Sequence, residues 1–355
     1  MAHTLRALCL NAGSSSLRLA LYALCDGREE LVLERAAGSD DAAMAANAAL
    51  DALARDEPEA WSSIDAVGHR IVHGGPRGDA PRRLDAAALD ELRRCVPLAP
   101  LHLPAALAVI ELVTRRLPRV PQVACFDTAF HRRMPELAQR LPLPDSLWEQ
   151  GMRRYGFHGL SFESVVQKLG AALAPRSVIA HLGSGSSVVA LREGVPIDTT
   201  MSFTPAGGVM MATRSGDLDP GVLVHLLREG WDADRIERLV TQQAGLLGVS
   251  GRSGDMRTLL AKRSEDPRAD LAIAMYCYQV RKAIGALAAA LGGLDLLVFT
   301  GAIGEGSAAI RDEICEGLAH LGAWKQGVVA TNENRMIARH TDAVLRGHGA
   351  APSAG

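Results

Sequence analysis

The stretch VIAHLGSGSSVVAL, residues 178–191, joins two short apolar runs through a turn rich in glycine and serine. The same arrangement stands near the start of the chain, where ALCL (7–10), the polar turn NAGSSS (11–16) and LRLALYAL (17–24) follow one another. Short apolar runs bounded by such turns are typical of buried strands. Two copies about 170 residues apart predict two related domains produced by duplication, with the general preference of Gly and Ser for turns as the alternative explanation.

A third glycine-rich segment differs from these two copies. The buried-strand pattern LLVF (296–299) runs into TGAIGEG (300–306) and then into an apolar repeat that includes Ile310 and Ile314. Ser307 stands where a helix N-cap is expected. We expect a strand, a glycine turn and a helix here, a unit that suits nucleotide contact at the helix N-terminus.

The whole chain has the composition of an ordinary globular protein. Its 355 residues suit two domains better than one core. Apolar residues make up 48% and charged residues 22%, and the formal net charge is −2. A surface so close to neutral attracts neither nucleic acid nor an anionic membrane, so any anion site must be built locally. Helix patterns at 84–95, 104–116, 220–229 and 268–290 mix with the strand patterns and predict an α/β fold.

Cysteine spacing and the start of the chain point to a reducing compartment. The six cysteines form no CxxC pair and no zinc-like spacing, so we expect free thiols. The first residues lead into a strand and not into a signal peptide. The apolar stretch 283–304 is broken by Gly292-Gly293 and by Asp295, which indicates a helix end, a turn and a buried strand. We therefore expect a soluble, cytoplasmic protein.

None of the glycine turns matches a common nucleotide fingerprint. The chain has no GxxxxGK[ST], and Val188 stands where a third glycine would follow Gly183 and Gly185 in a dinucleotide motif. The turns can still offer backbone N–H groups and hydroxyls to an anion. More specific are five segments dense in arginine, histidine and aspartate: GHRIVHGG (68–75), PLAPLH (97–102), CFDTAFH (125–131), RRYGFHG (153–159), and FTPAGG (203–208) with ATRSGDLDP (212–220).

With these segments and VFTGAIGE in this order, the chain resembles the acetokinase family, part of the superfold of actin, hexokinase and the heat-shock chaperones. The likeness runs from Leu8 to Thr341. It implies two duplicated ribonuclease-H-like domains with the active site in the cleft between them. Residues 1–150 with 334–355 would form the N-terminal domain, and 151–333 the C-terminal domain that carries most of the nucleotide site. The linker candidate is LPLP (141–144).

The resemblance implies Mg²⁺-dependent (or Mn²⁺-dependent) reversible transfer of a phosphoryl group between ATP and acetate, giving acetyl phosphate and ADP. A carboxylic acid is already ionised at neutral pH, so this nucleophile needs its charge screened and needs no general base. By motif position, Arg70 and Arg214 would clamp the carboxylate and the transferring phosphoryl group. His158 would stabilise the transition state with Arg214, and Asp127 would orient the reacting groups.

The same motif positions assign the remaining site residues. Asn11 and Glu333 would hold the metal, mostly through water. The substrate pocket would be lined by Arg70, Val72, Leu101, His102, Phe157 and Pro205. ATP or ADP would contact Ser14, Ser16, Arg18, His181, Gly183, Ser184, Gly185, Asp255, Met256, Arg257, Gly301, Ala302, Ile303 and Gly304. We expect structural roles for His69, His73 and His131, helix capping by Asp217 and Asp219, and surface or interface charges at Arg153 and Arg154.

The chain departs from the family pattern mainly near ATP. Ser184 and Gly306 replace asparagines, Ala302 replaces a glycine, Met256 replaces a phenylalanine, Asn334 replaces a glutamate and Arg18 replaces a lysine. The segment between residues 322 and 331 is also short, which predicts the loss of a piece of peripheral sheet. Each lost hydrogen bond is worth about 1–3 kcal/mol, so we expect retained activity with altered nucleotide affinity.

Two other functions compete with acetate phosphorylation. A propionate- or butyrate-preferring kinase is the nearer one, because a single methylene changes discrimination by only about 1–3 kcal/mol. Val72 would project into the methyl pocket and favour acetate. The other is a homologue that binds nucleotide without catalysis, which the departures near ATP favour and the intact arginines oppose. The resemblance also implies a homodimer.

Overall fold

The computed structural model describes residues 4–12, 17–38 and 41–347, and the chain divides into two compact units. Unit 1 comprises Met1–Arg132, His158–Gln167 and Asn332–Gly355, and unit 2 comprises Arg133–Phe157 and Lys168–Thr331. The segment 133–150, expected in the N-terminal domain, belongs to unit 2, and the linker candidate 141–144 lies inside it. The sequence-based domain boundaries stay a prediction.

Unit 1 contains a six-stranded mixed sheet in the order β3-β2-β1-β4-β6-β5. Strands β1, β2 and β3 are antiparallel neighbours, β1, β4 and β6 run parallel, and β5 is antiparallel to β6. The bounds are β1 Leu5–Ala12, β2 Leu17–Cys25, β3 Arg28–Ala37, β4 Ala66–Ile71, β5 Arg82–Arg83 and β6 Gln122–Phe126.

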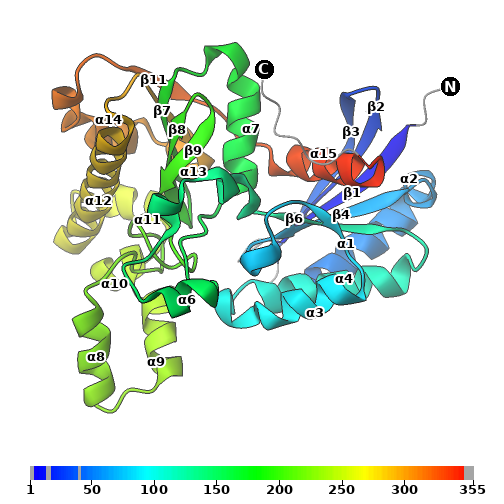
Figure 1. Ribbon diagram of the computed structural model, residues 1–355, viewed down its shortest axis with the longest axis horizontal. Coiled ribbons are helices and arrows are strands. Elements are labelled where there is room, and N and C mark those ends of the chain that lie inside the picture. The colour runs from blue at the N-terminus through cyan, green and yellow to red at the C-terminus, as the bar shows by residue number, and fades with distance from the viewer. Residues whose placement is uncertain (1–3, 13–16, 39–40, 348–355) are drawn as a thin grey trace. The chain divides into compact units, whose positions relative to one another are not determined.

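The central strand β1 supplies both faces of the unit 1 core. Successive side chains of a strand point to opposite faces. Leu8 and Leu10 accordingly pack with helices α1 (Ala42–Asp56) and α4 (Leu103–Arg116), whereas Ala7 and Cys9 pack with α15 (Glu333–Leu345). Figure 1 shows α15, in red, lying along strands β1, β4 and β6. A helix from the end of the chain is thus built into the first sheet.

Gly68 on β4 lets α15 approach the sheet closely. A Cβ at this position would meet the side chains of Thr341 and Ile337 on α15. Any larger residue would therefore push the helix away from the strand. This close packing of α15 on β4 fixes the start of the helix, where Glu333 is located.

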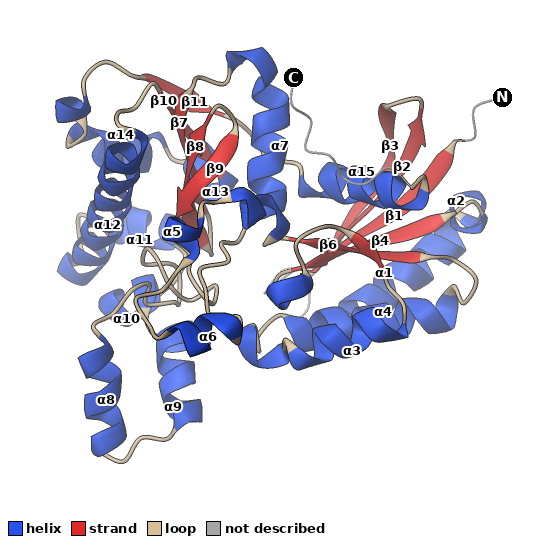
Figure 2. Cartoon of the chain, viewed as in Figure 1, coloured by secondary structure: helices blue, strands red, loops and turns tan. Residues whose placement is uncertain are grey.

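Unit 2 repeats the strand arrangement of unit 1. Its five-stranded sheet has the order β11-β10-β7-β8-β9, in which β7, β8 and β9 are antiparallel neighbours while β11, β10 and β7 run parallel. The order β9-β8-β7-β10-β11 thus matches β3-β2-β1-β4-β6 of unit 1, so the duplication predicted from the two turns is confirmed (Figure 2). The bounds are β7 Arg176–Leu182, β8 Ser186–Arg192, β9 Val195–Thr199, β10 Leu296–Thr300 and β11 Lys325–Val328.

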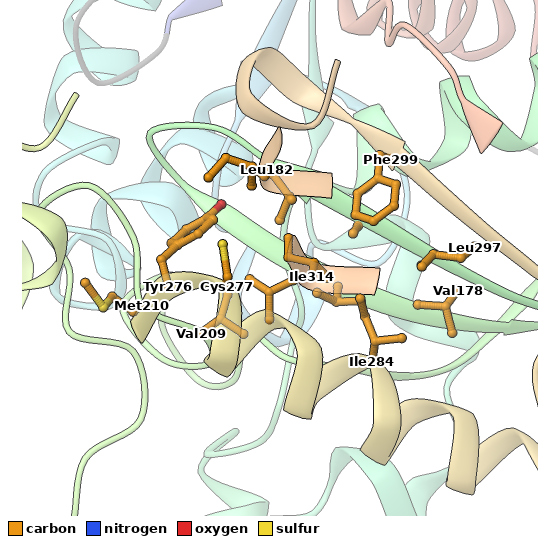
Figure 3. Close-up of a cluster of buried hydrophobic side chains, with 14 of the residues drawn as sticks. Val178, Leu182, Val209, Met210, Tyr276, Cys277, Ile284, Leu297, Phe299 and Ile314 are labelled. Atoms are coloured by element: carbon orange, nitrogen blue, oxygen red, sulfur yellow. The ribbon is translucent and has the colours of Figure 1, made fainter. Parts of the chain in front are cut away.

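The core of unit 2 forms where α12 (Pro267–Leu291) covers the sheet. Figure 3 shows Ile284 of this helix next to Val178 of β7, and Tyr276 near Leu182 at the end of the same strand, all of them buried. Helix α14 (Ala308–Glu316) adds Ile310 and Ile314, and the Ser307 side chain caps its N-terminus, as the sequence predicted. The remaining helices of unit 2 are α5 Glu136–Gln139, α6 Asp145–Glu149, α8 Pro220–Arg228, α9 Ala233–Arg238, α10 Gly245–Ser250, α11 Met256–Lys262 and α13 Gly301–Gly306.

The predicted strands and helices agree with the structure to within a few residues, except that residues 301–306, expected as a glycine turn, form helix α13. Unit 1 also contains α2 (Pro58–Ser62) and α3 (Ala86–Arg94), and α7 (Gly159–Leu169) begins in it. All six cysteines are free. Over the described ranges, no helix has both the length and the apolar character needed to cross a membrane.

Candidate active site

Two parallel strands of unit 1 deliver an arginine and an aspartate to one edge of the sheet. Arg70 lies near the carboxyl end of β4, and Asp127 directly follows β6, its parallel neighbour. The Arg70 side chain donates from Nε (2.9 Å) and from Nη2 (2.7 Å) to the same oxygen, Oδ2 of Asp127. The aspartate is completely buried. The two motifs predicted to carry the chemistry therefore meet in a buried ion pair.

The two predicted metal ligands join this pair. Asn11 lies in β1, and its Nδ2 donates to Oε2 of Glu333 at 2.7 Å. The remaining Arg70 nitrogen, Nη1, donates to Oδ1 of Asn11 at 3.1 Å and lies 3.5 Å from Oε2 of Glu333. Glu333 is the first residue of α15, which the close contact at Gly68 holds against the sheet. Four residues from four elements thus form one polar cluster.

The cluster shifts the pKa of both members of the ion pair. Burial raises the pKa of Asp127, and the nearby Glu333 adds to this, while the guanidinium of Arg70 opposes it. Burial disfavours the Arg70 charge, but the facing carboxylates of Asp127 and Glu333 outweigh it and raise the Arg70 pKa. The arginine is therefore held permanently charged in a site with little water.

His158 is placed beside this cluster by an unusual turn. Its backbone is in the left-handed region, with φ of +58°. The N–H of the next residue, Gly159, donates to the carbonyl oxygen of Asp127 at 2.9 Å, and a Cβ on Gly159 would meet that same oxygen. A non-glycine residue in the left-handed region costs free energy, so the strain at His158 is consistent with a functional position. The buried His158 ring lies in unit 1.

Unit 2 carries the second predicted arginine on a tightly packed loop. Arg214 donates from Nη1 to the carbonyl oxygen of Pro205 at 3.1 Å, and its own carbonyl accepts from the N–H of Met211. Gly245 presses on this loop, since a Cβ there would lie 2.7 Å from the Arg214 carbonyl oxygen. Arg214 and Pro205, predicted from separate motifs, are thus brought together.

The predicted phosphate turn lies at the β7–β8 hairpin of unit 2. His181 is near the end of β7, and Gly183 and Gly185 are buried while Ser184 is exposed. The carbonyl oxygen of Ser184 accepts from the N–H of Ala212, two residues before Arg214. The turn and the arginine loop are therefore joined through their backbones.

The predicted adenosine residues have more varied surroundings. Gly301 has φ of +79° and begins α13, and Ala302 and Ile303 follow it with accessible surface. Asp255 caps α11 through the Thr258 N–H, whereas the Arg257 side chain is 93% exposed. Met256, which replaces the phenylalanine of the family pattern, is buried in the hydrophobic core.

The remaining predicted residues are distributed as follows. Val72 and Phe157 are buried, Leu101 is exposed, and His102 directly precedes α4. Arg18 is exposed on β2 as the strand partner of Asn11. Ser14 and Ser16 lie outside the described residues. The contacts of His69 with Gln122, His73 with Gly75 and His131 with Phe162 agree with the expected structural roles, and Asp219 caps α8 through the Gly221 N–H as expected. Arg153 lies over the Trp148 ring, and the Asp217 side chain accepts from the Gly208 N–H instead of capping the helix.

The donors around Arg70 suit a hard divalent cation held partly through water. Asn11 and Glu333 present an amide oxygen and a carboxylate, and Oδ1 of Asp127 is buried without a hydrogen-bond partner among the described residues. Oxygen donors of this kind are what Mg²⁺ prefers, and Mg²⁺ keeps several of its waters. Within the same ranges no three acidic, histidine or cysteine side chains form a direct metal cage. The residues fit a magnesium ion that is bound mostly through its water shell.

The duplicated mixed sheet is the fold of solved acetate kinase structures, and here it carries a buried arginine–carboxylate cluster in one unit and glycine-rich turns in the other. The profile of the Acetokinase family matches residues 26–344. The chain belongs to this family, whose enzymes are phosphotransferases with a carboxyl group as acceptor.

Individual relatives agree with the family match. An acetate kinase of Rhodopseudomonas palustris (strain ATCC BAA-98 / CGA009) is 42% identical over 394 residues, covering 94% of this chain and 96% of the relative. The crystal structure of Porphyromonas gingivalis acetate kinase superposes with a TM-score of 0.81 at 34% identity, covering 96% of this chain and all of the other. That of a propionate kinase from Francisella tularensis gives 0.85 at 32% identity, with the same coverage.

Sequence reasoning gave no role to Glu305, whose side chain the structure places against the start of the predicted adenosine segment 301–304. Its Oε1 accepts from the Gly301 N–H at 2.9 Å, from the Thr300 hydroxyl at 3.3 Å and from the Thr331 N–H at 3.4 Å. The signal was the four-residue spacing from Gly301 to Glu305, which lets a side chain reach back to the first N–H of a helix. Thr331 is distant in sequence and could not be foreseen.

Proposed function

We propose that this protein catalyses reversible, Mg²⁺-dependent transfer of the γ-phosphoryl group of ATP to acetate, giving acetyl phosphate and ADP. The observation that carries the proposal is the buried Arg70–Asp127 pair at the ends of two parallel strands, tied to Asn11 and Glu333. Membership in the acetokinase family and the acetate kinase relatives support the same reaction.

The chemical step transfers no proton. A carboxylate oxygen of acetate attacks the γ-phosphorus, an O–P bond forms, and the bond to the bridging oxygen breaks with its electron pair left on ADP. The barrier is electrostatic, because an anion must approach a phosphate. Arg70 and Arg214 lower it by offering planar cationic donors to the carboxylate and to the phosphoryl oxygens. His158 donates to the equatorial oxygens as charge develops there.

The metal supplies further positive charge at the phosphates when it is bound. Asn11 and Glu333 would hold it, mostly through water, and Asp127 would orient that water shell through its buried Oδ1. Arg70 contacts all three of these side chains, so one residue aligns the metal ligands with the acceptor.

Acetate is the preferred acid in this proposal because the buried Val72 side chain would narrow the space left for the alkyl group of the acid. The structural likeness to a propionate kinase favours a second candidate, a preference for propionate or butyrate. A pocket separates acids that differ by one methylene by only about 10- to 200-fold, so the two candidates differ in preference and not in chemistry.

Hydroxylamine trapping of the acyl phosphate tests the reaction and the acid preference together. With ATP, Mg²⁺ and each acid in turn, we expect hydroxamate formation in the order acetate, propionate, butyrate. Arg214→Ala should lower the signal by about 100- to 1,000-fold. Arg192→Ala, an exposed arginine at the end of β8, is the matched control and should leave the signal unchanged. A higher rate with propionate would transfer the proposal to the second candidate.

Calorimetric titration with ATP separates both enzymes from a homologue without catalysis. ATP binding without any hydroxamate would indicate such a homologue. A flat titration together with no acyl phosphate would refute nucleotide-dependent transfer altogether.

We propose a second copy of the chain as partner and the cytoplasm as location, as the family likeness suggests. Helix α8 of unit 2 has no buried residue, and its Val222, Val224 and Leu227 side chains are 43–51% exposed. Apolar side chains gathered on one helix are typical of an interface. Light scattering should give the mass of a dimer, and Leu227→Glu should shift it towards the monomer. A monomeric wild type would refute this partner.

A further inference from the structure

One helix of unit 2 contacts both loops that the proposed reaction needs. Tyr276 and Gln279 stand three residues apart on α12 and so lie on the same face of the helix. Tyr276 reaches the phosphate turn, and Gln279 reaches the loop that leads to Arg214. Neither residue belongs to a motif by which the family was recognised.

Tyr276 holds the phosphate turn in place from the hydrophobic core of unit 2. Its ring lies in the hydrophobic core, and its hydroxyl is 2.9 Å from Oγ of Ser186, which is also completely buried (Figure 3). Oγ of Ser186 in turn accepts from the Gly183 N–H at 3.4 Å and donates to the Gly183 carbonyl oxygen at 3.3 Å. The hydrogen bonds therefore run from the Tyr276 hydroxyl through Ser186 and end on the backbone of the turn.

Gln279 fixes the arginine loop from the same helix. Its Oε1 accepts from the N–H of Met210 at 2.8 Å. The next residue, Met211, bonds to the Arg214 carbonyl, and Ala212 bonds to the carbonyl of Ser184 in the phosphate turn. The two loops are thus tied to each other and are both tied to α12.

We propose that Tyr276 and Gln279 are positioning residues that set the spacing between the phosphate turn and Arg214. The proposal deepens the function proposed above and rests on it. Phosphoryl transfer is sensitive to this spacing, because a misplacement of about 1 Å can cost two orders of magnitude in rate. A 25-residue helix packed into the core is a rigid base for such an arrangement.

Tyr276→Phe tests the first contact while keeping the packed ring. We expect the KM for ATP to rise about fivefold, since one buried neutral hydrogen bond is lost, while the KM for acetate stays unchanged. Tyr278→Phe is the matched control, because Tyr278 is 57% exposed on the same helix. It should behave as the wild type.

Gln279→Met tests the second contact, since methionine has similar length but accepts poorly. It should lower kcat about tenfold with a smaller change in the KM for ATP, because the affected loop carries Arg214. The Ser186→Ala and Tyr276→Phe changes act on one chain of hydrogen bonds. Their double variant should therefore be no worse than the more affected single one.

The outcomes separate positioning from folding and from the proposed function itself. A Tyr276→Phe enzyme with wild-type KM and kcat overturns the proposal, as does an equal rise in both KM values with a lowered melting temperature. If Tyr276→Phe does not fold, the kcat of Gln279→Met is the test. A kcat about tenfold below that of the wild type supports the proposal, and a wild-type kcat overturns it. If the wild type forms no acyl phosphate, the proposed function fails, and the proposal then stands or falls on whether Tyr276→Phe weakens binding of a fluorescent ATP analogue.

Discussion

The two units hold their predicted functional residues in different ways. In unit 1 the site is a cluster of side chains, Arg70, Asp127, Asn11 and Glu333, of which three are charged and all are largely buried. In unit 2 the site consists mostly of backbone, the turn 183–187 and the segment 300–304, held by hydroxyl, amide and carboxylate groups at single points.

This difference predicts that replacements cost more in the unit 1 cluster than in the unit 2 turns. A buried charge that loses its partner costs several kcal/mol, so a single replacement within the cluster is expected to be costly. A backbone N–H is offered by almost any residue, so the unit 2 turns can change side chains with a loss of one hydrogen bond. Ser184, Ala302 and Gly306 lie in or beside the unit 2 segments, whereas the unit 1 departures, Arg18 and Asn334, are neighbours of the cluster and not members of it.

The largest expected effect comes from Arg70→Lys in unit 1. Lysine keeps the positive charge but cannot make the separate bonds of Nε, Nη1 and Nη2 to Asp127 and Asn11. We expect hydroxamate formation to fall by about 100-fold or more, with the protein still folded. Wild-type activity in Arg70→Lys would show that the cluster works as a point charge only.

The stability of the cluster can be separated from its chemistry. Arg70→Ala leaves Asp127 buried without its cation and should lower the free energy of unfolding by about 3–5 kcal/mol. Adding Asp127→Asn should recover much of that stability in a denaturant titration without restoring activity. If the double variant recovered neither stability nor activity, or recovered both, it would contradict the view that the unit 1 cluster depends on its charged side chains.

A smaller effect is expected in unit 2 from Glu305→Ala. The substitution frees the N–H groups of Gly301 and Thr331, and we expect the KM for ATP to rise about tenfold. Glu305→Gln keeps an acceptor oxygen and should lie between this variant and the wild type. Equal values for the Ala and Gln variants would show that the negative charge of Glu305, and not its accepting oxygen, holds the segment.

Sequence patterns could predict the parts of this site that depend on neighbours in the chain. Arg70 and Asp127 follow apolar strands, so their place at a sheet edge was foreseeable, and the two glycine turns revealed the duplication. The folding of α15 back onto β1 is a different case. It joins Asn11 to Glu333 across 322 residues, and only the family resemblance indicated it.

The contacts that support the site residues from the protein core could not be predicted from local sequence patterns. Tyr276 is one apolar position among many on α12, and its hydroxyl bond to Ser186 spans 90 residues. Glu305 and Thr331 are brought together in the same way. Periodicity tells which face of a helix is buried, but it does not tell which polar atom will lie opposite.

The charge-built unit should also respond to pH through a buried histidine. His340 on α15 is buried, with Nε2 2.9 Å from Oε2 of Glu163 on α7. Burial disfavours the imidazolium, but the Glu163 carboxylate and Cys125 overcome this and raise the His340 pKa to about 10. Because the folded pKa lies above the ordinary value of about 6.5, its stabilisation is complete below that pH and is lost as the pH rises towards 10.

Melting temperatures recorded from pH 6 to pH 10 check this expectation. The wild type should lose stability across that range, and His340→Gln, which cannot be protonated, should show a flatter profile that starts lower. Parallel profiles for the two proteins would mean that the His340–Glu163 pair does not carry the pH dependence.

The smallest effect should come from restoring a family residue in unit 2. Ser184 is exposed at the phosphate turn, and its carbonyl, not its side chain, is bonded to Ala212. Ser184→Asn adds an amide donor without disturbing that bond, so we expect the KM for ATP to fall about three- to fivefold at unchanged melting temperature. Gly306→Asn can be added to it, because a Cβ at Gly306 meets no atom within 4 Å. If neither change improves ATP binding, the predicted ATP-binding segments of unit 2 differ from the family by more than single side chains. The use of backbone donors alone would then not explain why these segments accept substitutions.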